Sequence, residues 1–382
     1  MNEKIERTNN VIDDVVGNPN KLNSSSSLHG TKRIFFNAMN INIFVHEMPK
    51  VELHAHLNGS LSVNTIQELG AKLYGSKSEE FTHLSEQLTN FDNVDLGGCF
   101  EKFDFMHKLT STRRGLHLAT ILAIRDFAKD NVAYLELRTT PKNTEEMSKK
   151  DYLECVLEGI VRGKELHNIL VTLLISIDRS QSVAEAEETI NIIPKFRSRY
   201  NNIIAGIDFS GNPNKGNFSD FKPVLEKARE DNLKLSVHCA EIHNPSEVDE
   251  MIEFGMDRCG HGTFLTDQQL HKLGKQKVAI ECCLTSNVKC STVAKYSEHH
   301  FRNIFTSESA PVVLCTDDCG IFNTTLSNEF LMAKKYFALS KPDMMKLSLT
   351  AVDHAFVSEN VKRDLRRIIE RYFDSECLRL PC

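Results

Sequence analysis

Short apolar runs rich in β-branched residues recur along the chain from about residue 45 onward, with longer stretches of helical spacing between them. Runs of this length predict strands, and apolar positions three and four residues apart predict helices. Eight strands are predicted in this way, at 51–57, 132–138, 170–177, 203–209, 233–239, 257–262, 277–283 and 311–317.

Most of the predicted strands are separated by a predicted helix, as parallel strands require. One such helix begins after residue 243: Asn244 can cap it, Pro245 suits its first position, and Glu247 stands where a capping box needs a carboxylate. Eight repeats of strand plus helix match the arithmetic of a (β/α)8 barrel, the TIM barrel architecture. The sequence therefore predicts an α/β fold of this type.

A doubly wound open sheet is the alternative architecture. Such a sheet usually carries a glycine-rich phosphate turn after its first strand, and the sequence contains no GxGxxG or Walker pattern. The segment 58–131 is too long for a single crossover. We therefore expect extra helices after the first strand, over the mouth of the barrel, with 100–130 as their most helical part.

Composition divides the chain into two parts. Of its 382 residues, 41% are hydrophobic, which is enough to build a large core. The first 30 residues are polar and end in the low-complexity run NSSSSLHG. We expect residues 1–45 to form a polar, partly disordered arm and residues 46–382 to form the barrel.

Charge and cysteine usage exclude several classes of protein. A net charge of −6 and a pI near 6.2 argue against a nucleic-acid partner. The chain has no run of 18 apolar residues and no apolar leader at its N-terminus, so no membrane partner is expected. Eleven cysteines without a CxxC pair indicate reduced thiols. We expect a cytoplasmic monomer that acts on a small molecule.

Titratable residues collect at the carboxyl ends of the predicted strands, where a parallel barrel carries its functional groups. His54 and His56 end the first strand, two residues apart and therefore on the same face. His238 ends the fifth strand, and Asp317 follows the apolar run PVVLCT of the eighth. Three imidazoles and one carboxylate are a ligand set suited to a single zinc ion, although cobalt and iron remain alternatives.

Each of these residues also has an ordinary structural explanation. The two histidines on the first strand are compatible with an edge strand that faces water. His238 is compatible with a hydrogen-bonded core histidine, and Asp317 with a helix cap or a buried ion pair. The prediction of a metal site rests on the four residues together.

Glu241 and His261 lie near the same strand ends and are not needed as ligands, so they are free for proton chemistry. Bound zinc lowers the pKa of water from 15.7 to about 7 and so supplies hydroxide. A nearby histidine can orient that water or take its proton, and a nearby carboxyl group can deliver a proton to the substrate. The structural alternatives are a carboxylate at a helix start for Glu241 and a turn residue between glycines for His261.

Four motifs carry a specific resemblance, and they occur in family order between about residue 46 and residue 372: MPKVELHAHLNGS, HCAEIHNP, RCGHGTFL and CTDDCGIF. They closely resemble the adenosine/AMP deaminase family of metal-dependent hydrolases. The resemblance implies a (β/α)8 barrel with one zinc ion per chain. It also implies that the zinc ligands are His54, His56, His238 and Asp317.

The resemblance also implies roles for four further residues. Glu241 would protonate N1 of a purine, and His261 would position and deprotonate the water that attacks C6. Asp318 would be the acceptor for N7, and the backbone of Gly211 would donate to N3. The implied reaction is hydrolytic deamination to an inosine-type product.

Asn58 departs from the pattern of adenosine deaminases proper, which have an aspartate that faces the 5′ hydroxyl of ribose. A carboxylate about 4 Å from a phosphate would cost about 4 kcal/mol per unit charge at an effective dielectric near 20. That is close to a thousandfold in affinity. Neutral Asn58 removes this repulsion, unless it is only a turn residue before Gly59 that touches no ligand.

The runs ELRTTP (136–141), CLTSNVK (283–289) and HHF (299–301) resemble the adenosine deaminase-like branch, which converts N6-methyl-AMP to IMP and methylamine. A nucleotide monophosphate is therefore the preferred substrate. Candidate phosphate or ribose contacts are Thr139, Thr140, Ser286, Asn287 and Lys289.

Three other functions remain open at this point. The first is an ordinary adenosine deaminase. The second is a barrel that binds purines or a partner protein without catalysis, although such a protein has no need of Glu241 and His261. The third is a binuclear amidohydrolase, which bridges its metals with a carbamylated lysine after the fourth strand. The segment DFSGNP offers no lysine there.

Overall fold

The computed structural model describes residues 41–89 and 106–379. The chain divides into two compact units, one ending at His46 and one beginning at Glu47. The described part of the first unit, residues 41–46, is helical. The predicted disorder of the arm 1–45 falls almost entirely on residues outside the described ranges. Everything below concerns the second unit.

Eight parallel strands form one sheet in the order of the sequence, β1 to β8. They are β1 (Lys50–His56), β2 (Val132–Thr139), β3 (Leu170–Asp178), β4 (Ile204–Ser210), β5 (Lys234–Cys239), β6 (Arg258–His261), β7 (Ala279–Cys282) and β8 (Val312–Leu314). A parallel bridge between Ala55 and Asp317 joins the last strand region back to the first. The predicted (β/α)8 barrel is confirmed, including all eight strands.

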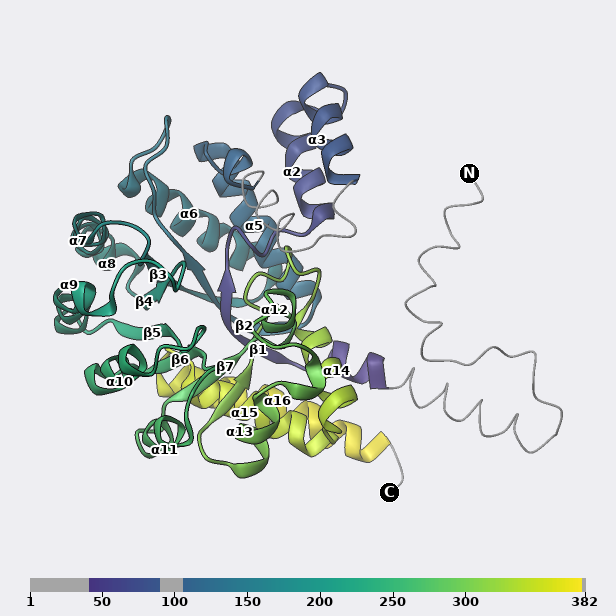
Figure 1. Ribbon diagram of the computed structural model, residues 1–382. Helices are drawn as coiled ribbons and strands as arrows, with labels where there is room; N and C mark the ends of the chain where they lie inside the picture. The colour runs from purple at the N-terminus through teal and green to yellow at the C-terminus, as the bar shows by residue number, and fades with distance from the viewer. Residues whose placement is uncertain (1–40, 90–105, 380–382) are drawn as a thin grey trace, which may run out of the picture. The chain divides into compact units, whose positions relative to one another are not determined.

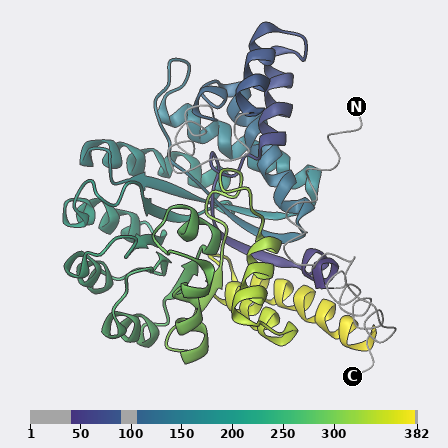
Figure 2. The same cartoon turned by 45° about the vertical axis from the view of Figure 1, so that its right-hand side comes forward.

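Helices surround the strands on the outside, as Figures 1 and 2 show. Those between β1 and β4 are α2 (Val63–Tyr74), α3 (Glu79–Thr89), α5 (Arg113–Lys129), α6 (Lys149–His167), α7 (Val183–Ile192) and α8 (Pro194–Tyr200). Those between β4 and β8 are α9 (Phe218–Glu230), α10 (Pro245–Phe254), α11 (Asp267–Lys275), α12 (Leu284–Lys289), the 3-10 helix η4 (Tyr296–Glu298) and α13 (Phe301–Ser307). After β8 follow α14 (Leu326–Phe337), α15 (Lys341–His354) and α16 (Glu359–Arg379).

The extra helices after β1 are α2 and α3, which stand out from one side of the barrel in Figure 1. The most helical stretch of this insertion is interrupted, because α5 begins only after Thr112, whose side chain accepts a hydrogen bond from the backbone of Gly115. The α5 helix then serves as the crossover from β1 to β2. Residues 90–105 of the insertion lie outside the described ranges.

At the start of α10, local sequence determines the cap, whereas tertiary packing determines the partner of Glu247. Asn244 caps the helix and Pro245 is its first residue, as predicted. Glu247 does not complete a capping box. Its carboxylate instead accepts hydrogen bonds from Arg179 Nη2 at 2.5 Å and from the backbone of Phe218 at 2.9 Å. The predicted capping box is therefore wrong, because the buried guanidinium of Arg179 is a stronger partner for the Glu247 carboxylate than the backbone N–H of the cap.

The barrel interior contains several buried charged side chains near the carboxyl ends of the strands. Arg138 and Arg258 are fully buried and share the carboxylate of Glu281, which is also fully buried. Arg258 binds Glu136 as well, at 2.6 Å, and its guanidinium lies 3.6 Å from the ring centroid of Phe356. These charges are paired inside the barrel, where an unpaired ion would be very costly.

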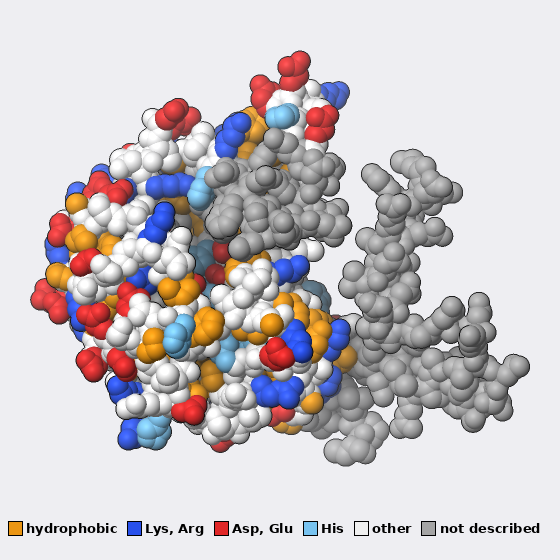
Figure 3. Space-filling view, viewed as in Figure 1, with side chains coloured by type: hydrophobic (Ala, Val, Ile, Leu, Met, Phe, Trp, Pro, Cys, Tyr) orange, Lys and Arg blue, Asp and Glu red, His pale blue; other side chains and the backbone are white. Residues whose placement is uncertain are grey.

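Charged side chains cover much of the face of the molecule that Figure 3 draws. On the face drawn in Figure 3, acidic and basic side chains are interspersed and form no single basic patch. Across residues 41–89 and 106–379, none of the helices has the length and apolar character to cross a bilayer.

Candidate active site

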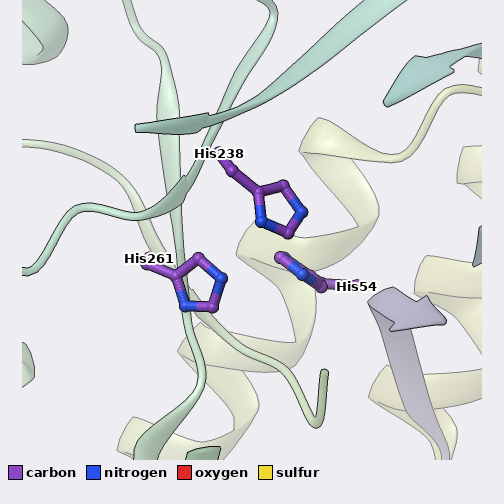
Figure 4. A group of neighbouring side chains, drawn as sticks. All are labelled: His54, His238 and His261. Atoms are coloured by element: carbon purple, nitrogen blue, oxygen red, sulfur yellow. The ribbon is translucent and has the colours of Figure 1, made fainter. Parts of the chain in front are cut away.

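The four candidate metal ligands meet at the carboxyl ends of three strands. His54 and His56 come from β1, His238 from β5, and Asp317 follows β8. The Nε2 atoms of His54 and His56 each lie 3.4 Å from Asp317 Oδ1. The ring centroids of His54 and His238 are 4.6 Å apart. Figure 4 shows the rings of His54, His238 and His261 converging from their separate strands.

The hydrogen bonds of His54 show that its free nitrogen suits a cation. His54 Nδ1 lies 2.8 Å from Glu281 Oε2. Burial opposes ionisation of Glu281, but Arg138 and Arg258 outweigh it and hold the pKa of that carboxyl well below its usual range. An ionised carboxylate only accepts, so His54 Nδ1 carries a proton and donates it to Glu281. Its Nε2 lone pair then faces Asp317 Oδ1, and among the described residues it has no hydrogen-bond partner.

The surroundings of Asp317 also suit a carboxylate that binds a cation. Burial opposes its charge, but His54, His261 and His56 hold the pKa of Asp317 well below its usual range. Ser286 Oγ donates to Asp317 Oδ2 at 2.7 Å, which leaves Oδ1 facing the histidines. A lone pair on each of two imidazoles and a carboxylate oxygen, directed at one point, is stable only with a positive ion between them. The residues present therefore fit a metal ion.

A buried ion network holds the imidazoles in place. Arg138 donates to Glu281 Oε2 at 2.6 Å and to Asp208 Oδ1 at 2.7 Å, and it also donates to the backbone oxygen of Leu53 at 2.7 Å. Glu281 anchors His54, and Asp208 Oδ1 lies 3.2 Å from His238 Nε2. One guanidinium thus links the carboxylates that contact two of the ligand candidates, an arrangement that fixes ligand orientation in metal sites.

Three residues of the site adopt left-handed backbone conformations that side chains rarely take. The φ angles are +56° at Ala240, +61° at His261 and +63° at Asp317. Each lies at the carboxyl end of a strand, where the chain turns away from the barrel. Non-glycine residues in this region cost about 1–3 kcal/mol each and cluster at functional sites.

Glu241 and His261 lie beside the metal-ligand candidates, as predicted. Glu241 Oε1 is 3.1 Å from His238 Nδ1 and 3.9 Å from His261 Nε2. Burial opposes the charge of Glu241, but the neighbouring His261 and His238 outweigh it and lower its pKa. Burial lowers the pKa of His261 to about 4 despite Glu241 and Asp317, so this imidazole is neutral at pH 7.

Asp318 and Gly59 are packed against each other. A Cβ added at Gly59 would lie 1.6 Å from Asp318 Oδ1, so only glycine fits beside this carboxyl group. Burial, together with the charges of Asp317 and Glu241, raises the pKa of Asp318 well above its usual range. Among the residues that the structure describes, Asp318 Oδ1 has no hydrogen-bond partner. A protonated carboxyl group at this position can donate a hydrogen bond to a ligand.

At the rim, the chain after β1 runs beside the end of β2. The backbone of Leu57 donates to Arg138 O at 2.8 Å, which brings Asn58 next to Thr139. The hydroxyl of Tyr152, from α6, bonds Thr139 Oγ1 at 2.8 Å and the side chain of Asn58. Asn58 Oδ1 is buried and has no hydrogen-bond partner among the described residues, so the amide N–H of Asn58 is the group that meets Tyr152.

The sequence analysis did not identify Tyr152 of this rim, nor Lys142, which follows β2 in the chain. Lys142 comes three residues after the end of β2, is half-buried, and has no ion pair with any described residue. Burial lowers its pKa to about 8. The rule that functional residues follow the carboxyl ends of strands could have identified Lys142. Nothing in the sequence distinguishes Tyr152 from a core residue of α6.

The remaining predicted contacts lie in different surroundings. Gly211 follows β4 with φ +101°, and a Cβ there would meet Asp178 Oδ1 at 2.0 Å. Ser286 contacts Asp317, as described above, and Asn287 Nδ2 lies 3.4 Å from His261 Nδ1, so both are buried at the metal-ligand cluster. Thr140 is half-buried beside Thr139, whereas Lys289 is exposed at the end of α12.

A second group of potential ligands, Cys282, His299 and His300, lies behind His261. Both ring nitrogens of His299 are occupied, since Nδ1 accepts from the backbone of Phe301 and Nε2 contacts Asn287 Oδ1, each at 3.0 Å. The Nδ1 lone pair of His299 is therefore already taken by a backbone N–H, which can only donate.

Comparison with known families and proteins gave consistent matches. A family model described as adenosine deaminase matches residues 49–372. The "Adenosine deaminase-like protein" of Drosophila melanogaster is 51% identical over 332 residues, which are 87% of this chain and 98% of that protein. The "N6-mAMP deaminase" of Arabidopsis thaliana is 36% identical over 351 residues, 86% of this chain and 98% of that protein.

Solved structures give the same result for the fold. A crystal structure of Arabidopsis ADAL complexed with IMP has a TM-score of 0.76 and 36% sequence identity. The alignment covers 86% of this chain and 97% of that one.

Proposed function

This chain belongs to the adenosine deaminase family, and we propose that it hydrolyses N6-methyl-AMP to IMP and methylamine. The family resemblance predicted from the four motifs is confirmed by the match over residues 49–372. The observation that carries the proposal is the convergence of His54, His56, His238 and Asp317 below a rim in which residue 58 is neutral.

Hydrolases of this family are metal-dependent, and we propose zinc as the ion, one per chain. His54, His56 and Asp317 would hold it together with His238, since three nitrogens and one oxygen suit zinc. Zinc supplies hydroxide at neutral pH by lowering the pKa of a bound water to about 7.

The chain's own residues orient the purine and move protons. Glu241 delivers a proton to N1, which makes C6 more electrophilic. His261, whose Nε2 lies 3.9 Å from Glu241 Oε1, holds the nucleophilic oxygen. Asp318 is protonated and donates to N7, instead of accepting as the sequence predicted, because its pKa is raised and N7 has only a lone pair to offer. The backbone N–H of Gly211 donates to N3. In the overall reaction the oxygen of water joins C6, one of its protons stays on N1 of the product, and the other leaves with the amine.

The 5′ phosphate is held at the rim formed by the ends of β1 and β2. Asn58 adds no negative charge there, and its amide is oriented by Tyr152. Lys142 supplies a positive charge that no described residue neutralises. Thr139 and Thr140 add hydroxyl groups at the same edge. Ser286 and Asn287 are engaged at the metal-ligand cluster instead, which favours the β1–β2 rim as the phosphate subsite.

The relatives support this substrate class. The Arabidopsis relative is named N6-mAMP deaminase, and the Arabidopsis ADAL structure holds IMP, which is a purine 5′-monophosphate. An adenosine deaminase is the rival function.

Steady-state kinetics on N6-methyl-AMP, AMP and adenosine tests the proposal. The highest kcat/KM is expected for N6-methyl-AMP, and a higher value for adenosine would refute the phosphate argument. A binding barrel without catalysis is tested by Glu241→Gln. This variant is expected to keep zinc and purine binding and to lose turnover, whereas full activity would remove Glu241 from the mechanism.

A further inference from the structure

A chain of buried hydrogen bonds leads from the backbone of α13 to His261. The N–H of Phe301 donates to His299 Nδ1 at 3.0 Å. His299 Nε2 lies 3.0 Å from Asn287 Oδ1, and Asn287 Nδ2 lies 3.4 Å from His261 Nδ1. The three residues linked by these hydrogen bonds are almost entirely buried, with 1% exposure for His299, 2% for Asn287 and 3% for His261.

The first bond of this chain determines the direction of all the others. A backbone N–H can only donate, so His299 Nδ1 carries a lone pair and its proton is on Nε2. That proton requires the oxygen of Asn287, so the amide cannot be flipped. Thr292 Oγ1 supports the same orientation, because it donates to the backbone oxygen of Asn287 at 3.1 Å and accepts from Asn287 Nδ2 at 3.2 Å.

The amide therefore presents its second N–H to His261 Nδ1. A nitrogen that accepts a hydrogen bond carries a lone pair, so the ring proton of neutral His261 is on Nε2. That nitrogen is the one 3.9 Å from Glu241 Oε1, a separation too long for a direct hydrogen bond. An oxygen atom held between the two would receive an N–H from His261 and would face the carboxylate of Glu241.

We propose that Asn287 and His299 are positioning residues that fix the proton of His261 on Nε2. His261 then donates a hydrogen bond to the nucleophilic oxygen and does not take its proton. The inference rests on the proposed deaminase function for its consequence in catalysis, but the tautomer itself follows from hydrogen bonds alone.

This assignment changes the route of the proton. With Nε2 already protonated, Glu241 is the group that accepts the proton when the O–H bond of water breaks. The same proton passes from Glu241 to N1 of the purine as the oxygen forms its bond to C6. One carboxylate thus both receives and delivers the proton, and its charge is restored without an external base.

Nuclear magnetic resonance reads the tautomer directly in the full-length zinc-loaded protein. With 15N-labelled histidine, long-range proton–nitrogen correlations distinguish a protonated ring nitrogen from an unprotonated one. The parent protein is expected to show His261 protonated on Nε2 only. A proton on Nδ1 of His261 would overturn the proposal, and this measurement needs neither a variant nor a substrate.

Asn287→Asp reverses the arrangement. Its carboxylate accepts from His299 Nε2 and from His261 Nδ1, so the His261 proton moves to Nδ1 and Nε2 loses its donor. Loss of one such donor at the reacting oxygen lowers kcat by about 10²–10³-fold. We expect that loss with little change in KM, together with the altered histidine spectrum. Unchanged or higher kcat in Asn287→Asp would show that His261 works as a base and would overturn the proposal.

Thr292→Val is the matched control. It removes the hydroxyl that contacts Asn287 Nδ2, but His299 Nε2 still fixes the orientation of the Asn287 amide. Its kcat and its His261 tautomer are expected to match the parent, and a shifted tautomer would contradict the chain of reasoning. An error in the proposed substrate would be distinguishable from an error in the proposed tautomer. It would appear as poor turnover of N6-methyl-AMP by the parent, with the tautomer measurement unaffected.

Discussion

Replacing Glu281 by glutamine tests whether the buried ion network holds the metal-ligand candidates. The carboxylate accepts from Arg138 at 2.6 Å, from Arg258 at 2.5 Å, from His54 at 2.8 Å and from Ser236 at 3.0 Å. Glutamine keeps the shape but removes the charge. It also turns one acceptor into a donor, which must face an N–H of one of these partners.

The size of the effect follows from this geometry. Both guanidinium groups are fully buried, and breaking a buried ion pair by removing one partner costs about 3–5 kcal/mol. That is a large part of a typical stability of about 5–15 kcal/mol. Because His54 loses the charged acceptor that orients it, zinc affinity should fall by about 10–100-fold.

Urea unfolding of the metal-free protein, followed by circular dichroism, measures the first effect, since the chain has no tryptophan to report by fluorescence. Competition with a chromogenic chelator measures zinc affinity. Glu165→Gln is the matched control, because Glu165 pairs with Arg162 at 3.0 Å on the surface and should contribute less than about 1 kcal/mol. If Glu281→Gln resembled this control in both measurements, the network would not have the role assigned to it.

Three further changes probe the phosphate rim and a buried acid. Asn58→Asp should lower kcat/KM for N6-methyl-AMP by about a thousandfold, from repulsion of about 4 kcal/mol at 4 Å. Its kcat/KM for adenosine should change far less, and equal losses on both substrates would contradict the argument. Lys142→Met should raise KM for the nucleotide by roughly 10- to 100-fold, since a charged hydrogen bond contributes about 1.5–3 kcal/mol. An unchanged nucleotide KM would place the phosphate elsewhere. Burial raises the pKa of Glu329 to about 7, although Thr285 and Thr324 donate to it. The folded state then binds a proton that the unfolded state has released, so this group costs stability as pH rises from about 4.5 to 7. Glu329→Gln should therefore gain up to about 1.4 kcal/mol per pH unit over the parent in that window, measured by urea unfolding. A pH-independent difference between the two proteins would show that Glu329 does not titrate there.

The barrel could be predicted from sequence because its signals are local. Each strand is an apolar run, and even the four-residue strand β6 (Arg258–His261) lies within the predicted range 257–262. Proximity of the site residues followed from one rule, that strand ends meet at one end of a parallel barrel. Extra helices in the insertion were predicted, but the break at Thr112 within 100–130 was not, because that cap lies inside a stretch with continuous helical spacing.

Partners of buried charges could not be predicted, because they come from strands that are distant in sequence. Glu52 illustrates this: it lies on β1, yet its Oε2 accepts from the backbone and hydroxyl of Thr316 at 3.1 and 2.8 Å. Its Oε1 accepts from the backbone of His54 at 2.9 Å. The orientation of the Asn287 amide could not be predicted either, since it depends on the hydrogen bond from the backbone N–H of Phe301 to His299. Amphipathic patterns report which residues are buried, but not which groups they meet.

The seam between β1 and the residues after β8 has a consequence for the order in which the protein is made. Glu52 and Thr316 are 264 positions apart, and the Ala55–Asp317 bridge closes the same seam. During synthesis, His54 and His56 leave the ribosome early, but Asp317 reaches them only after all eight strands exist. A nascent chain that stops before β8 therefore lacks the complete ligand set. With the proposed ligands, tight metal capture would require that the whole barrel has been translated and closed.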